Sequence, residues 1–446
     1  MNSSRLGRVF SVAVLASLLA ACGSSTASTS TAQVGGSVSL WAEWSSGEQA
    51  SFTAALSPFQ TQTGTTVNYA SKGSNIDTVL EAAVSGGAPP DVALIPDPGT
   101  LQTLAKQGSI KDITSILGSL SSNYGSAWNT LGSYNGKLYG VWFKGANKNT
   151  IWYNPAQFAA ASISSPPKTW EELVQDIATL KAAGVTPFSL CTDVGWPVAD
   201  FWQNVYLKSA GAAKYNALSA HSVKWTDPTV TTAFTTMAQV TGTGSNLAGG
   251  IQGSLSNAYP ACVDKVFPKA GSQPQAAMVF EGDFVATEIT GNSKNYTPGT
   301  GASCTTDPSK TPCYNFFDFP ALSANSANQA AIQGAGDVAV MLKDTPQSEA
   351  LMKYLAGPDG ATIWAHLGGF ASPNKTVAAS AYPDTVSKAI AQGLVGASSF
   401  VFSLDDLQGT WEKNMWQDLL DFVKNPGSVS SIQATMDQQA TTGLGH

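Results

Sequence analysis

Hydrophobic and polar residues follow two different spacings from residue 38 onwards. The segments 38–44, 66–71 and 91–96 are short and rich in apolar residues, which predicts β-strands. The segments 47–64 and 75–87 lie between them, and their apolar residues have the spacing of one side of a helix. Strands separated by helices of about ten residues or more are typical of βαβ units, so we expect a mostly parallel sheet.

A second group of elements follows further along the chain. Thr169 and Glu172 form a capping box, and the helix that they start has apolar residues at helical spacing until Gly184 stops it. The segment 185–191 predicts a strand with Pro187 at its start or on an edge. We also expect a buried strand at 333–342, helices at 346–356, 384–396 and 411–424, and loops at 241–275 and 291–313. The sequence therefore predicts an α/β protein with two units.

The first 21 residues have the parts of a secretion signal. Arg5 and Arg8 precede a 13-residue apolar run, which is too short to cross a bilayer, since a membrane helix needs about 20 residues. The run ends in Leu-Ala-Ala before Cys22, which resembles the lipobox of bacterial lipoproteins, where the cysteine is lipidated and becomes the mature N-terminus. The alternative is an ordinary cleaved signal. We expect a lipid anchor at Cys22, a flexible tether over residues 22–35, and an extracytoplasmic protein held at the bacterial cell membrane.

Composition excludes some classes of partner. The chain has 23 lysines and arginines against 30 aspartates and glutamates, a formal net charge of −7, and no dense basic run. Binding to nucleic acid or to an anionic lipid surface is therefore not expected. The only two arginines lie in the predicted signal, so the mature chain has none with which to bind an anionic ligand.

Four cysteines besides Cys22 indicate two disulfides in an exported protein. Four cysteines allow three pairings, which the sequence does not decide between. The turn-forming segment between Cys304 and Cys313 favours that pair and leaves Cys191 with Cys262. No group of cysteines and histidines has the spacing of metal ligands, so we predict neither a metal nor a cofactor.

Four stretches, in order, resemble the extracellular solute-binding proteins of carbohydrate ABC importers. This group includes the maltose-binding proteins, and the likeness is greatest to a glucoside-binding subgroup. The stretches are NGKLYGVWFKGANKNTIWYNP (135–155), PPKTWEEL (166–173), AAMVFEGDF (276–284) and residues 336–375, and GWPVADFW (195–202) resembles the subgroup more weakly. The loop-rich regions with the four cysteines do not match the family pattern, which leaves the edges of the pocket open.

The resemblance implies a periplasmic-binding-protein type II architecture with two α/β lobes and a hinged cleft between them. Lobe 1 would comprise residues 36–145 and 332–370, and lobe 2 would comprise residues 146–331 and 371–446. The implied function is to capture a neutral sugar or oligosaccharide in the cleft and deliver it to the permease of an ABC transporter. The protein would then act as a monomer and would not be an enzyme.

The candidate site residues are chosen for sugar chemistry. Sugar rings stack on aromatic side chains, and their hydroxyl groups need hydrogen-bonding partners such as carboxylates. Several of the candidates follow predicted strands, where ligands bind to such sheets. Glu281 and Asp283 lie two residues apart, so an extended backbone would place both on one face. The candidates are Trp44, Glu48, Asp97, Lys148, Trp196, Trp202, Glu281, Asp283, Gly369 and Phe370.

Each candidate also has a structural interpretation. The tryptophans could belong to the core, Asp97 could start a turn, and Gly369 could end a helix. Two alternative functions are a secreted glycoside hydrolase, which would use Glu281 and Asp283 as its two carboxylates, and a binding protein for a ligand other than a sugar. No GxSxG or HExxH motif supports an enzyme.

Overall fold

The first β-sheet has six strands in the order β13-β12-β3-β1-β2, with β6 paired to β12. The computed structural model describes residues 34–118, 122–291, 296–299, 312–397, 399–408 and 411–443. The strands of this sheet are β1 (Ser37–Ala42), β2 (Thr66–Ser71), β3 (Val92–Ile95), β6 (Gly140–Asn147), β12 (Ala331–Met341) and β13 (Ser399–Phe402). β1 is parallel to β2 and β3, and β12 is parallel to β13, but β12 is antiparallel to β3 and β6. The three strands predicted between residues 38 and 96 pair in parallel, as expected, and the antiparallel pairs of β12 make the whole sheet mixed.

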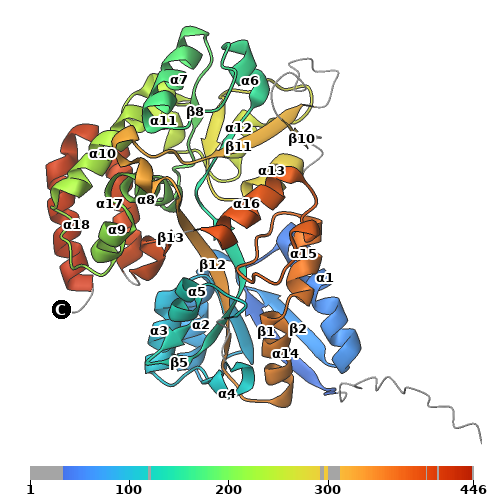
Figure 1. Ribbon diagram of the computed structural model, residues 1–446. Coiled ribbons are helices and arrows are strands. Elements are labelled where there is room, and N and C mark those ends of the chain that lie inside the picture. The colour runs from blue at the N-terminus through green and yellow to red at the C-terminus, as the bar shows by residue number, and fades with distance from the viewer. Residues whose placement is uncertain are drawn as a thin grey trace, which may run out of the picture. The chain divides into compact units, whose positions relative to one another are not determined.

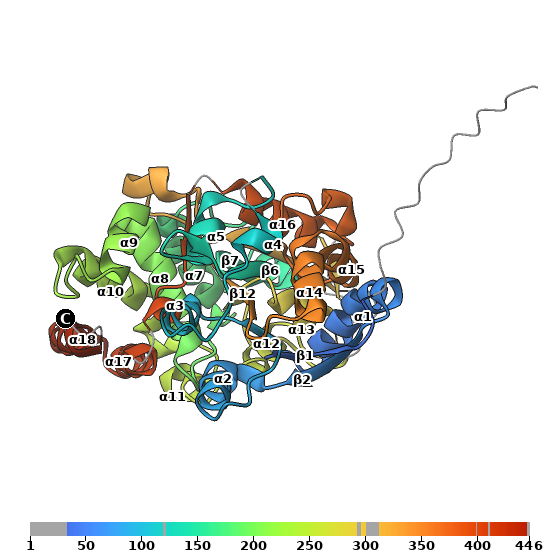
Figure 2. The same ribbon diagram turned by 90° about the horizontal axis from the view of Figure 1, so that it is seen from below.

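Helices cover both faces of this sheet. They include α1 (Ser46–Thr63), α2 (Ile76–Ser85), α3 (Pro98–Lys106), α4 (Thr114–Leu117), α5 (Ser126–Leu131), α14 (Pro346–Ala356) and α15 (Asp359–Leu367), and a hairpin of β4 (Ser133–Tyr134) and β5 (Lys137–Leu138) lies beside them. Figure 2 shows α1 and α14 on one side of β1 and β2, with α2 on the other. Leu40, Val92 and Val338 of the sheet are fully buried in the core that results.

The second sheet has five strands in the order β10-β11-β7-β9-β8. They are β7 (Thr150–Tyr153), β8 (Phe188–Ser189), β9 (Met278–Phe280), β10 (Thr297–Pro298) and β11 (Cys313–Asp318). Around it lie α6 (Pro155–Ala160), α7 (Trp170–Ala182), α8 (Trp196–Ala210), α9 (Ala212–Ser219), α10 (Pro228–Thr241), α13 (Val285–Thr290), α17 (Glu412–Lys424) and α18 (Val429–Gly443). In α7 the capping box is half formed on the side-chain oxygen of Thr169, which accepts from the Glu172 N–H.

Three segments of chain connect the two sheets (Figure 1). β6 passes into β7 through residues 148–149, β12 follows β11, and the chain runs from β13 into α17. Residues 371–402, which the sequence analysis assigned to lobe 2, supply Ala371, Leu394 and Phe402 to the core of the first sheet. The same stretch supplies Val386 and Ile390, both on α16 (Thr385–Gly396), to a core that contains residues of the second sheet. Residues 371–402 therefore pack against the core of the first sheet and against a core that contains residues of the second sheet.

Many predicted elements lie within two residues of the observed ones, but the region 241–275 was wrongly predicted as loops. It contains α11 (Gly250–Ser254) and α12 (Ala261–Val266), because Cys262, Val263 and Val266 bury their side chains. Cys191 and Cys262 form a disulfide, as the favoured pairing requires. Cys304, the signal peptide, Cys22 and nearly all of the tether lie outside the described residues, so the statements about them remain predictions.

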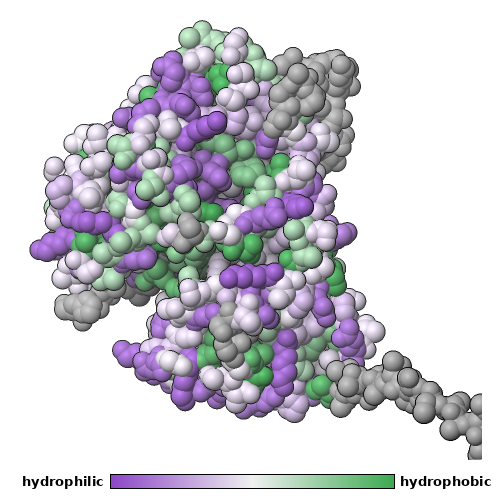
Figure 3. Space-filling model, viewed as in Figure 1, coloured by the Kyte–Doolittle hydropathy of each residue, from purple (hydrophilic) through white to green (hydrophobic). Residues whose placement is uncertain are grey.

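Among the described residues, no helix is both long enough and apolar enough to span a bilayer. On the face shown in Figure 3, polar and apolar residues are interspersed over both sheets' helices. This agrees with a chain in which only 12% of the residues are charged.

Candidate functional site

Two buried lysines flank the first connection between the sheets. Lys144 on β6 is 7% exposed, and Lys148, just before β7, is 8% exposed. The Nζ atom of Lys144 lies 2.6 Å from a carboxylate oxygen of Glu48, and that of Lys148 lies 2.9 Å from one of Asp200. Burial opposes the positive charge, but the carboxylates outweigh it and hold the pKa of both lysines above the usual value. Both lysines therefore stay charged at neutral pH.

Indole rings lie beside each lysine. The Nζ atom of Lys144 is 5.6 Å from the ring centroid of Trp44 and 5.4 Å from that of Trp364. The Nζ atom of Lys148 is 5.9 Å from the ring centroid of Trp196. A cation within about 6 Å of an indole face is attracted to it. Each lysine is thus held by one carboxylate and by aromatic faces.

The two site tryptophans differ in exposure. Trp196, the first residue of α8, is partly exposed, and its ring centroid lies 5.8 Å from that of Tyr259 and 6.1 Å from that of Phe284. Trp44, which follows β1, is only 1% exposed and meets Trp364 edge-on at 4.7 Å. Its Nε1 atom has no acceptor among the described residues.

Three buried carboxyl groups near the lysines have oxygens without a hydrogen-bond donor among the described residues. Both oxygens of Glu281, one of Asp283 and one of Asp337 are of this kind, and the residues are 0%, 6% and 5% exposed. Burial raises the pKa of all three carboxyl groups, that of Asp283 to about 7. Lys148 opposes the shift at Glu281, and Lys144 opposes it at the other two. Such oxygens are suited to accept hydrogen bonds from hydroxyl groups.

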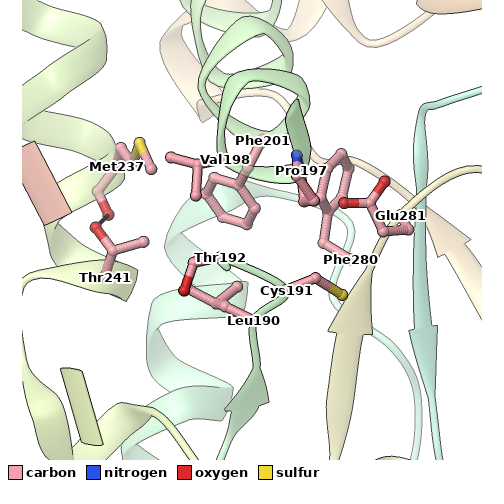
Figure 4. A pocket seen from close by; sticks show the side chains of 10 residues that line it. All are labelled: Leu190, Cys191, Thr192, Pro197, Val198, Phe201, Met237, Thr241, Phe280 and Glu281. Carbon is pink, nitrogen blue, oxygen red and sulfur yellow. Dashed lines mark hydrogen bonds between the residues drawn. The ribbon is translucent and has the colours of Figure 1, made fainter. Parts of the chain in front are cut away.

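A small cavity lies beside Glu281 (Figure 4). Its volume is about 10 Å³, and its lining comes from the β8 region, α8, α10 and the end of β9. The lining residues are Leu190, Cys191, Thr192, Pro197, Val198, Phe201, Met237, Thr241, Phe280 and Glu281. This volume suits about one water molecule and is far too small for a sugar ring.

Polar residues on one face of α8 hold all three connections between the sheets. Asp200 accepts from the side-chain amide of Gln333 on β12 at 2.8 Å and from the Ser403 hydroxyl, just after β13, at 3.4 Å. Asn204 donates to the backbone carbonyl of Lys148 at 2.9 Å and to the side chain of Gln333. These groups are 8% exposed or less, so the bonds form in a poorly solvated place. One helix thus joins the site to the connecting segments.

The structure brings six of the predicted site residues together. Glu48 and Trp44 contact Lys144, whereas Trp196 contacts Lys148. The charge of Lys148 lowers the pKa of Glu281 against the effect of burial, and that of Lys144 does the same for Asp283. Glu281 and Asp283 were predicted to lie on one face, but each of them interacts electrostatically with a different lysine.

The prediction that Trp202 contacts the ligand is contradicted by its burial. Its ring is 0% exposed, stacks on Tyr206 at 5.3 Å and on Trp225 at 5.2 Å, and belongs to the core of the second sheet. A side chain without any exposed surface in this packing cannot form a platform for a ligand, so Trp202 is structural.

Three further candidates have structural roles in the described contacts. Asp97 caps α3, accepting from the Gly99 N–H at 2.6 Å, and burial raises its pKa to about 6. Phe370 is 4% exposed and stacks on Trp364 at 5.1 Å. Gly369 has φ +64°, and a Cβ added there would overlap the hydroxyl of Thr287 on α13. Its small size thus allows a close approach of α13 rather than of a ligand.

The set of candidates left out Glu43, Lys144, Asp200 and Asp337. Asp200 could have been found from the polar positions 200, 203 and 204, which interrupt an otherwise apolar helix at a helical spacing. Asp337 is the one charged residue in the apolar strand β12. A charge inside a buried strand needs a partner, so this lone aspartate was a usable signal in the sequence.

A group of acidic residues lies near the start of α17. Asp405, Asp406 and Glu412 each place one oxygen within 4.8 Å of the others, which is close enough for one cation. Both oxygens of Asp405 already accept hydrogen bonds, from Gln203 at 2.7 Å and from Trp416 at 2.7 Å. The prediction of no metal site stays a prediction.

Solved structures of binding proteins have a similar fold. A chitin oligosaccharide binding protein has a TM-score of 0.75 at 20% identity, covering 92% of this chain and 99% of its own. The bacterial solute receptor AcbH has a TM-score of 0.76 at 18% identity, covering 91% and 99%. The fold is therefore that of the two-lobed, type II periplasmic binding proteins.

The sequence profile of the bacterial extracellular solute-binding proteins matches residues 42–362, and the chain belongs to this family. Among its relatives, the osmoprotective compounds-binding protein GgtB of Synechocystis is 27% identical over 83% of this chain and 84% of its own. The alpha-glucosides-binding periplasmic protein AglE of Rhizobium meliloti is 25% identical over 89% and 85%.

Proposed function

We propose that this protein captures a neutral sugar or short oligosaccharide between its two lobes and delivers it, chemically unchanged, to the permease of an ABC transporter. The observation that carries the proposal is the combination of a partly exposed indole, Trp196, with buried carboxylate oxygens that lack donors at Glu281 and Asp283. Sugars offer both an apolar C–H face and hydroxyl donors. AglE, an alpha-glucosides-binding protein, supports this class of ligand.

Ligand binding would shift the population of the lobes towards a closed state, because a ligand that both lobes contact binds that state better. The lobes would be those expected from the sequence, residues 36–145 with 332–370 and residues 146–331 with 371–446. The stretch 371–402 packs on both sides, and it would move least during closure.

Isothermal titration of the purified full-length protein with maltose, sucrose, trehalose and raffinose tests the proposal. Binding of at least one sugar is expected, and binding of none of them, alongside tight binding of a peptide or polyamine, would contradict it. Trp196→Ala is expected to weaken binding about tenfold or more, as loss of an aromatic anchor does. Trp41→Ala is the matched control, because Trp41 is also partly exposed and has a lysine, Lys72, 3.9 Å above its ring.

We propose no covalent chemistry. An aryl glycoside would be left intact by the wild-type protein, and turnover that disappears in Glu281→Gln would instead support a glycoside hydrolase with two carboxylates.

We further propose that Cys22 carries the lipid that holds the protein at the membrane surface and that the protein acts as a monomer there. A flexible tether of residues 22–35 would span on the order of 20 Å. Metabolic labelling with a fatty-acid analogue is expected to mark the wild type and not Cys22→Ser. Labelling of both proteins would contradict the anchor.

A further inference from the structure

Three aromatic side chains from separate segments of the chain meet beside the start of α8. Trp196 is the first residue of α8, Tyr259 lies two residues before α12, and Phe284 directly precedes α13. The ring centroid of Trp196 lies 5.8 Å from that of Tyr259 and 6.1 Å from that of Phe284, and the other two centroids are 5.5 Å apart. We call these three rings the aromatic corner.

Solvent reaches each residue of the aromatic corner. All three side chains are partly exposed, whereas Trp152 and Trp202 of the nearby cores are fully buried. The three ring planes are inclined to one another by 60° to 86°. Rings in this arrangement can contact one apolar ligand ring by its face and by its edge at the same time. A contiguous apolar surface of this kind marks a binding site, whereas single exposed apolar residues do not.

Polar groups suited to sugar hydroxyls lie next to the aromatic corner. The Nζ atom of Lys148 is 5.9 Å from the ring centroid of Trp196. Phe284 directly follows Asp283 in the sequence and is three residues from Glu281, and both carboxyl groups have oxygens without a donor among the described residues. A sugar ring with its C–H face on the aromatic corner would therefore direct hydroxyl groups towards the candidate site.

The disulfide between Cys191 and Cys262 joins the segments that carry two of the three rings, and it holds their Cα atoms 5.3 Å apart. Cys262 lies three residues after Tyr259, and Cys191 lies five residues before Trp196. Cys191 also lines the small cavity that borders Glu281 (Figure 4). The disulfide is therefore built into the side of the candidate site.

Hydrogen bonds of Asn257 reinforce this link. The carbonyl oxygen of Asn257 accepts from the Thr192 N–H at 3.1 Å, and its side-chain amide donates to the carbonyl oxygen of Leu190 at 2.8 Å. Asn257 lies two residues before Tyr259 and is 4% exposed, and both of its partners are buried as well. Because buried hydrogen bonds are costly to break, the loop that carries Tyr259 is held on the segment that leads into α8.

We propose that Tyr259 is a second aromatic contact for the bound sugar, beside Trp196, and that the disulfide and Asn257 position it for this contact. The inference rests on the proposed function, which it deepens by adding a ligand-contacting residue and by giving the disulfide a part in binding. Tyr259 and Cys262 lie in the region 241–275, which did not match the family pattern. This region would thus supply one edge of the binding site.

Titration calorimetry on the full-length protein tests the contact, with maltose, sucrose, trehalose and raffinose as ligands. Tyr259→Ala is expected to raise the Kd of the tightest-binding of these sugars about tenfold, as loss of an aromatic anchor does. Tyr259→Phe keeps the ring and is expected to stay within about threefold of the wild type. A Tyr259→Ala protein with the wild-type Kd for every sugar that binds would overturn the contact.

Tyr134→Ala is the matched control. Tyr134 on β4 is also partly exposed, and its ring meets that of Tyr139 at an interplanar angle of 67°, the same angle as between Trp196 and Tyr259. This variant is expected to bind sugar as the wild type does. A tenfold loss of affinity in Tyr134→Ala would overturn the assignment of the loss in Tyr259→Ala to a ligand contact.

Combined substitutions test the positioning role. Cys191→Ser with Cys262→Ser, and separately the milder change Asn257→Ala, are each expected to raise the Kd about threefold or more. In the Tyr259→Ala background neither change is expected to raise it further, because residues that act through one contact are not additive. An equal rise in both backgrounds, or no rise in either, would overturn the positioning role. Circular dichroism checks that each variant is folded, and Asn257→Ala decides the question if the cysteine variant does not fold.

The wild-type titration separates this inference from the proposed function. If the wild type binds none of the four sugars, the proposed function fails and the inference fails with it. If the wild type binds a sugar and Tyr259→Ala binds that sugar equally well, only the inference fails.

Discussion

The ion pair between Lys148 and Asp200 offers a demanding test of the site. Asp200 is fully buried, and besides Lys148 it holds the side chains of Gln333 and Ser403. Asp200→Ala leaves the ammonium group of Lys148 without its partner in a place where it is 8% exposed. Breaking one side of a buried ion pair costs about 3–5 kcal/mol, so we expect a loss of free energy of unfolding in that range.

A second substitution separates stability from binding. In the double variant Asp200→Asn with Lys148→Met, neither charge remains, and buried pairs replaced by uncharged groups of similar volume are often neutral in stability. We therefore expect the double variant to recover most of the stability that Asp200→Ala loses. Sugar binding is not expected to recover, because Lys148 is absent from its position 5.9 Å from the ring of Trp196.

Urea unfolding followed by tryptophan fluorescence gives the stabilities, and titration calorimetry gives the affinities. A loss below about 1 kcal/mol in Asp200→Ala would show that the pair is effectively solvated and would refute the reasoning from burial. Sugar affinity equal to the wild type in the double variant would remove Lys148 from the site. Glu349 and Lys353 on α14 form an exposed ion pair at 3.6 Å, and Glu349→Ala is a matched control that should cost less than about 1 kcal/mol.

Three more predictions concern stability. Trp202→Ala should cost about 3–5 kcal/mol in urea unfolding by emptying the core of the second sheet, while any folded fraction keeps the wild-type sugar affinity. Cys191→Ser with Cys262→Ser should cost about 4 kcal/mol, since the bridge closes a loop of 71 residues, and a loss near zero would contradict this. Asp283, with its pKa raised to about 7, stabilises the fold at low pH and loses that contribution as pH rises from about 4 to about 7, so Asp283→Asn should flatten the pH dependence of the melting temperature over that window.

Local signals in the sequence were sufficient for the regular elements. The bounds of α14 were predicted without error, because Thr345 caps it and Gly357 ends it. The helices α11 and α12 were missed because each has only five or six residues, with two glycines in α11, and helices this short depend on packing for their stability. In α12, for example, Cys262 is held by a disulfide to Cys191, which lies 71 residues away in the sequence.

The site could be predicted only in part for a similar reason. Trp196 and Trp202 both belong to α8 and lie in the same short motif, yet one is partly exposed and the other is fully buried. Sequence spacing does not say which face of α8 meets the second core, because this depends on α10, α17 and other elements far along the chain. Asp337 was missed although it is the one charged residue of the apolar strand β12, because strand patterning does not say which distant charge lies opposite it; Lys144 of β6 does.

The position of α8 gives a physical basis for the proposed coupling between the candidate site and the segments that connect the two sheets. The helix begins with Trp196 at the candidate site, and within two turns it presents Asp200 and Asn204 to the connecting segments. A helix of 15 residues with buried hydrogen bonds is stiff, so a ligand that moved Trp196 or Lys148 would also change the contacts of Gln333 on β12. Because all three connections meet this one face, they cannot respond to a ligand independently. Closure should therefore be a concerted motion about α8 rather than three separate hinge movements.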